Sequence, residues 1–134
     1  MGNGKRIALE EAELAYVPLV PDDALANSST SIGAWQCDGS TQTEQYFSSG
    51  VRIFEDENTI KDPEGAWQTM AKDSPSDTSV GEVLGQSAAV ISPHDIARGS
   101  VSVVLGDVWI VVEGNGRASA VELLRVAESL QRIP

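Results

Sequence analysis

The feature that most constrains the fold lies near the C-terminus, where two apolar runs flank Gly106-Asp107. A Gly-X pair between apolar runs is typical of a two-residue β-hairpin turn, so strands are predicted over residues 100–105 and 108–113. With Leu105 opposite Val108, one hairpin face carries only aliphatic side chains: Val101, Val103, Leu105, Val108, Ile110 and Val112. A shift of one residue would replace this face with a mixed set, so the pattern also predicts the register.

A helix is predicted directly after this hairpin. Ser119 and Glu122 have the spacing at which a hydroxyl and a carboxylate cap the free N–H groups of a first helical turn. The apolar residues that follow recur on one side of a helix: Ala120, Leu123, Leu124, Ala127 and Leu130. An amphipathic helix of this kind buries its apolar stripe against the aliphatic face of the hairpin.

Upstream of the hairpin, the pattern predicts shorter elements. These are a short helix within 7–16, an extended stretch over 17–21, strands over 32–38, 43–47, 51–55, 80–84 and 87–91, and a helix from Pro63 to about Lys72. Residues 55–58 are expected to form an acidic loop tip. Trp67 is expected to face the core.

These elements predict an α+β fold in which an antiparallel β-sheet packs against a C-terminal helix and one or two shorter helices. A chain of 134 residues with 41% hydrophobic content is long enough for one core, so residues 1–134 are expected to form a single domain. Residues 1–6 are expected to be disordered or foreign to the natural protein.

The charge balance limits the kinds of partner. Nine Lys and Arg residues against 20 Asp and Glu residues give a net charge of −11, which repels nucleic acids and anionic lipid surfaces. No apolar run approaches the roughly 18 residues of a membrane span, so no membrane insertion is expected. A protein partner, with a basic surface, and a homodimer both remain compatible with the composition.

No catalytic, cofactor-binding or metal-binding residue is predicted. Cys37 is the sole cysteine and His94 the sole histidine, which excludes an intrachain disulfide and a multi-histidine metal site. The acidic residues between 55 and 64 lack the alternating ligands and mid-loop glycine of a calcium loop. Gly114-x-Gly116 lacks the parallel-strand context of a dinucleotide site and is interpreted as a turn before a helix cap.

The candidate interaction surface consists of Trp109, Val111, Glu55, Asp56 and Glu57. Trp109 and Val111 lie on the second face of the hairpin, which must be covered by another element or be a partner surface. Coverage is favoured, because hairpins that pack both faces do so inside larger sheets.

Four segments together resemble a known kind of bacterial domain: Leu9-Glu10-Glu11-Ala12, Pro18-Leu19-Val20-Pro21, the Gly106-Asp107 hairpin, and residues 122–130. The pattern resembles a bacterial extracytoplasmic domain family of unassigned function, similar to anti-sigma-factor-regulator and lipoprotein-carrier-like domains. This resemblance implies an antiparallel sheet packed by helices, located outside the cytoplasmic membrane and often tethered by an upstream segment. It supplies no catalytic residues.

The expected function is therefore a non-enzymatic binding or regulatory module that acts on another protein. One alternative is a small-molecule or lipid carrier, which requires an apolar cavity between sheet and helix. Another is a hydrolase that uses His94 and Asp95, which requires a nucleophile close to both.

Overall fold

The computed structural model describes residues 5–7, 19–21, 29–37, 40–93, 98–114 and 118–132. The strands are β1 (Lys5–Ile7), β2 (Leu19–Val20), β3 (Ser29–Cys37), β4 (Ser40–Phe47), β5 (Arg52–Glu57), β6 (Thr78–Val83), β7 (Gln86–Ile91), β8 (Ser100–Leu105), β9 (Val108–Glu113) and β10 (Gln131–Arg132). The described helices are α2 (Pro63–Asp73) and α3 (Ala120–Glu128).

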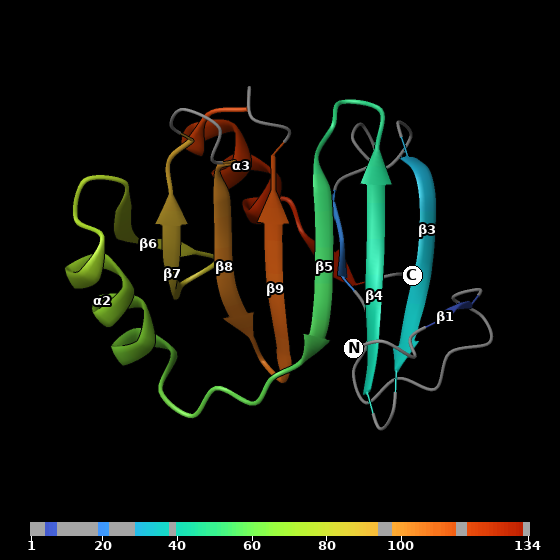
Figure 1. The fold of residues 1–134 in the computed structure, drawn as a ribbon, viewed down its shortest axis with the longest axis horizontal. Helices are drawn as coiled ribbons and strands as arrows, with labels where there is room; N and C mark the ends of the chain where they lie inside the picture. The colour runs from blue at the N-terminus through green and yellow to red at the C-terminus, as the bar shows by residue number, and fades with distance from the viewer. Residues whose placement is uncertain are drawn as a thin grey trace.

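Eight of these strands form one antiparallel sheet in the order β1-β3-β4-β5-β9-β8-β7-β6 (Figure 1). β2 and β10 form a separate two-stranded antiparallel sheet. The predicted α+β class, with an antiparallel sheet packed against helices, is confirmed.

The β8–β9 hairpin has the predicted register, with Leu105 opposite Val108 and Val103 opposite Ile110. Val103 and Ile110 are fully buried. Gly106 has a φ of +64°, which a glycine adopts without the strain that a Cβ would add. The aliphatic face that the sequence predicts is therefore the centre of the main core.

α3 covers this face, as predicted, and lies behind β8 and β9 in Figure 1. The Ser119 hydroxyl accepts a hydrogen bond from the Glu122 N–H at 3.2 Å, so the predicted N-cap is present. Leu123 and Ala127 are fully buried in the main core cluster, whereas Leu124 is only partly buried against it.

α2 covers the opposite face of the sheet at its β6–β7 end. The carboxylate of Asp62 caps this helix by accepting a hydrogen bond from the Gly65 N–H, and Pro63 occupies its first turn. Trp67 is 2% exposed in a second core cluster with Ala89 and Val104, against which Trp109 is partly buried. The favoured interpretation, that another element covers the Trp109 face, is confirmed at this end of the sheet.

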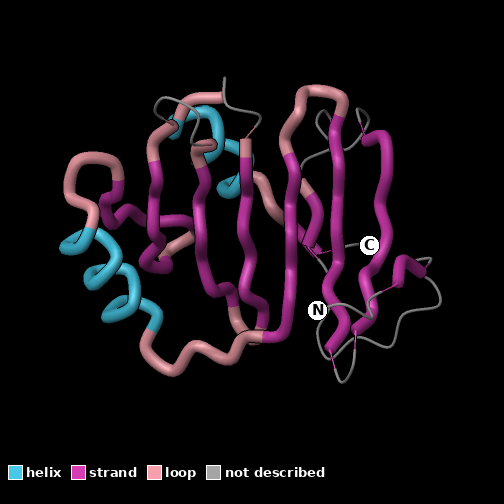
Figure 2. Tube along the Cα trace, in the orientation of Figure 1, coloured by secondary structure: helices cyan, strands magenta, loops and turns pink. Residues whose placement is uncertain are grey.

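A connection over residues 58–62 brings α2 to the β6–β7 end of the sheet. It leaves β5 and runs past the ends of β9 and β8 to the start of α2 (Figure 2). The Asn58 N–H donates to the Asp107 carbonyl oxygen at 2.8 Å, which ties this connection to the β8–β9 turn.

Lys5 and Arg6 belong to β1, which pairs with β3, whereas residues 1–4 of the segment expected to be disordered or foreign to the natural protein lie outside the described residues. Two expectations near the strand ends are wrong. Ile7 ends β1 instead of beginning a helix, and the rest of that predicted helix lies outside the described residues. Residues 55–57 are not a loop tip, because β5 pairs with β9 as far as Glu57 and Val108.

Candidate functional site

The face of the sheet that carries α2 has a second part, over β4, β5 and β9, that no described helix or strand covers (Figure 1). We call this part the open face. Its side chains are all partly exposed: Tyr46, Arg52, Phe54, Val111 and Glu113.

Strand alternation places these side chains together. Tyr46 pairs with Arg52 across β4 and β5, and Phe54 pairs with Val111 across β5 and β9. Because successive side chains in a strand point to opposite faces, the residues next to these in sequence turn toward α3. Register alone therefore gathers aromatic, aliphatic and charged groups on one surface.

The aromatic side chains of the open face contact each other and a cation. The ring centroids of Tyr46 and Phe54 are 6.2 Å apart with an interplanar angle of 89°, an edge-to-face arrangement. The Arg52 guanidinium lies 5.8 Å from the centroid of the Phe54 ring. These contacts orient the exposed parts of three large side chains.

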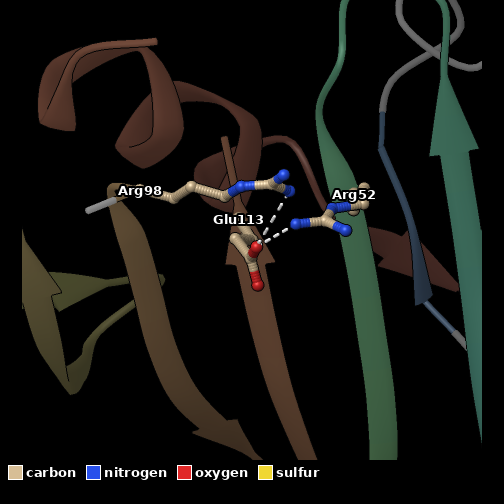
Figure 3. A network of polar contacts seen from close by, with 3 residues as sticks. All are labelled: Arg52, Arg98 and Glu113. Carbon is tan, nitrogen blue, oxygen red and sulfur yellow. Dashed lines mark hydrogen bonds and ion pairs between the residues drawn. The ribbon is translucent and has the colours of Figure 1, made fainter. Parts of the chain in front are cut away.

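The same guanidinium forms an ion pair with Glu113, which stands opposite Arg52 in the strand register. Arg98 approaches the same Glu113 carboxylate oxygen at 3.5 Å, so two guanidinium groups flank one carboxylate (Figure 3). Exposed ion pairs of this kind contribute little stability. Their clearer effect is to hold charged groups beside the aromatic pair.

The structure separates the five residues of the sequence-predicted surface. Val111 lies on the open face, and Asp56 is on the same side of β5, opposite Trp109. Trp109 is partly buried against the α2 cluster, and its Nε1 donates a hydrogen bond to the Ser102 hydroxyl at 2.8 Å. Glu57 is exposed at the end of β5.

Glu55 does not belong to any exposed surface. It is fully buried on the α3 side of the sheet, where its Oε1 accepts a hydrogen bond from the Leu19 N–H at 2.8 Å. The Thr43 hydroxyl lies 3.0 Å from its other carboxylate oxygen. Burial raises the pKa of the Glu55 carboxyl from 4.5 to about 7, although the hydrogen bonds from Leu19 and Thr43 lower it. Its assignment to a partner surface was wrong because β5 extends further than predicted.

Sequence reasoning missed the polar residues around Glu55. Thr43 and Gln45 are 1% and 2% exposed, respectively, and both turn inward from β4. No local signal in the sequence marked them, because polar residues are rarely buried and β4 is separated from the apolar hairpin by β5. The open-face residues Tyr46, Arg52 and Phe54 were missed because the partner strands of β5 could not be identified.

A separate groove of about 850 Å³ lies between the start of α2, the β6–β7 hairpin and the β8–β9 turn. Asp62, Glu64 and Glu82 are among its lining residues and make it acidic. Within the described ranges, no three His, Cys, Asp or Glu side chains come together as a metal site. The acidic residues that sequence reasoning tested for calcium are therefore not gathered around one point.

His94, Asp95, Asn115 and Gly116 lie outside the described residues, so the hydrolase and turn interpretations at these positions stay predictions. Cys37 ends β3.

No helix in the described part of the chain is both long enough and apolar enough to span a membrane. Searches with protein-family models, curated proteins and solved structures find no significant match to the chain.

Proposed function

We propose that this protein is a non-enzymatic module that binds another protein through the open face. The observation that carries the proposal is the edge-to-face pair of Tyr46 and Phe54, partly exposed on a sheet face that neither described helix covers. The stability of the fold has other sources, because both core clusters form without these two side chains.

The chemistry of the open face suits protein recognition. Aromatic side chains and arginine are enriched at the centres of protein interfaces, where they supply contact area at a low entropy cost. Val111 extends the apolar centre beside Phe54, and the ion pair of Arg52 with Glu113 borders it. The partner would present an apolar patch bordered by charges. A regulatory role outside the cytoplasmic membrane, which the sequence resemblance implies, forms part of this proposal.

Site-specific photo-crosslinking in cells that make the protein tests this proposal. A crosslinker at position 54 should capture a discrete partner, whereas one at Val80, 41% exposed on β6, should not. The purified partner should then bind Phe54→Thr at least about tenfold more weakly than the wild type, because a central interface aromatic contributes 1.4 kcal/mol or more.

Val80→Thr is the matched control, since it also replaces an exposed apolar strand residue with threonine, and it should bind like the wild type. Equal affinities for the two variants, or no capture from position 54 above that from position 80, would contradict the proposal.

The carrier alternative has no specific observation in its favour. Leu123 and Ala127 of α3 are fully buried in the same cluster as Val103 and Ile110 of the sheet, so these side chains occupy the contact between the two layers. A ligand that copurifies in native mass spectrometry would favour the carrier over the binding module.

A further inference from the structure

Two side chains of the main sheet hold the main chain of β2 at one residue. The Glu55 carboxylate accepts the Leu19 N–H at 2.8 Å, and the Gln45 side-chain amide donates to the Leu19 carbonyl oxygen, also at 2.8 Å. Both polar groups of Leu19 are thus bound by side chains, in the way that a neighbouring strand would bind them. We call this contact the Leu19 clamp.

The Leu19 clamp joins two layers of the molecule. β2 pairs with β10, with Leu19 opposite Arg132, and β10 follows α3 in the chain. Gln45 and Glu55 come from β4 and β5 of the eight-stranded sheet. The contact between the two-stranded sheet and the main sheet therefore includes a buried carboxyl group.

The neighbours of this carboxyl in the described strand registers are uncharged. They are Thr43 and Gln45 from β4 and Ile110, its partner in β9. On this face of the sheet the closest charged position of β5 is Glu57, exposed two residues further along the strand, and Arg132 of β10 is paired with Leu19 in the register.

We propose that Glu55 acts as a pH-dependent latch: its neutral form keeps β2 and β10 docked on the main sheet, and its ionisation favours a state in which they have opened. The neutral carboxyl can still accept the Leu19 N–H and can donate its proton to the Thr43 hydroxyl oxygen, 3.0 Å away. The ionised form keeps its acceptors but must remain in a site with no exposed surface.

The size of the pH effect follows from the thermodynamic linkage between proton binding by Glu55 and the opening of β2 and β10. In the docked state burial raises the pKa of Glu55 to about 7, and once β2 lifts away, water returns it toward 4.5. Because the open state binds the proton less tightly, it gains population as pH rises through this window. The opening equilibrium should rise by up to about two orders of magnitude between pH 5 and pH 8.5.

Amide hydrogen exchange of Leu19, measured by NMR from pH 5.5 to 8.5, tests the latch. After correction for the intrinsic exchange rate, the protection of this amide should fall as pH rises toward 7 and level off above it, and at every pH it should be lower than that of Val103 in β8. Glu55→Gln keeps an acceptor for Leu19 and cannot ionise, so its Leu19 protection should not vary with pH.

A flat wild-type profile, a pH-dependent profile in Glu55→Gln, or equal protection of Leu19 and Val103 would each overturn the latch. If Glu55→Gln does not fold, the carboxyl ¹³C shift of Glu55 in the wild type gives its pKa directly, and an ordinary value near 4.5 overturns the proposal. Thr43→Val removes a hydrogen bond that lowers this pKa, so it should move the exchange midpoint to higher pH, and an unchanged midpoint would also count against the latch.

Discussion

At the scale of single residues, burial in this protein follows strand alternation more closely than residue type. Glu55 is ionisable and fully buried, whereas its neighbour Phe54 is aromatic and partly exposed. The reason is that β5 lies between β4 and β9, with its odd-numbered residues toward α3 and its even-numbered residues toward the open face. A carboxyl placed inward can remain there only with hydrogen-bond partners, which Leu19 and Thr43 supply.

We therefore expect Glu55→Gln to change how the free energy of unfolding depends on pH. The folded pKa of about 7 lies above the unfolded value of 4.5, so the folded state binds the proton more tightly. The stability from the neutral carboxyl is fully present below pH 4.5 and is lost as pH rises through 7. Between pH 4.5 and pH 8.5 the wild type should lose up to about 3 kcal/mol more than Glu55→Gln in urea unfolding. Parallel curves for the two proteins would refute this.

At the scale of elements, the two described helices stabilise opposite faces in different ways. α3 follows β9 after a short connection and inserts Leu123 and Ala127 into the main core. α2 packs mainly through Trp67, whose Nε1 also donates a hydrogen bond to the Ser87 carbonyl oxygen at 3.0 Å. α2 packs on the β6–β7 end of its face, so neither described helix covers the open face.

Of the two leucines of α3, Leu123 is the one whose substitution should lower the free energy of unfolding more. Leu123→Ala should lower the free energy of unfolding by about 2–5 kcal/mol, because this side chain is fully buried. Leu124→Ala should lower the free energy of unfolding by clearly less, because Leu124 is only partly buried. For the same reason, Leu124→Asp should destabilise the protein less than Leu123→Asp. Thermal and urea unfolding of the four variants measure this, and the reverse order would contradict the packing of α3.

At the scale of the whole molecule, the charge is strongly negative, and the few described ion pairs join exposed or half-exposed side chains. The net charge is −11, and Arg52 and Arg98 share Glu113 on the open face. Repulsion among the excess carboxylates destabilises the folded state, while exposed ion pairs contribute little stability. Long-range repulsion should therefore dominate the electrostatic part of the folding free energy.

Salt should consequently stabilise the protein. Raising the ionic strength from about 0.01 M to 0.5 M shortens the screening length from roughly 30 Å to less than 10 Å, which weakens repulsion across the surface. We expect the urea midpoint at pH 8 to rise with sodium chloride. The midpoint of Glu55→Gln should rise slightly less, because this variant has one carboxylate fewer. A midpoint that falls with salt would show that the ion pairs outweigh the repulsion.

The sequence by itself determined the β8–β9 hairpin, its register, the cap of α3 and the course of α2. Each of these depends on residues close together in the chain, such as Gly106 between two aliphatic runs or Ser119 three residues before Glu122. Local periodicity carries that information directly.

Only the tertiary structure decided which strands flank β5, and with that the burial of Glu55 and the composition of the open face. β5 pairs with β9, whose residues lie more than 50 positions away in the chain, so no local pattern marks the partner. The contacts of Leu19 with Gln45 and Glu55 also join distant positions, 26 and 36 residues apart in the chain. Such pairings are chosen by the packing of the whole sheet, and they decide which side of a strand meets water.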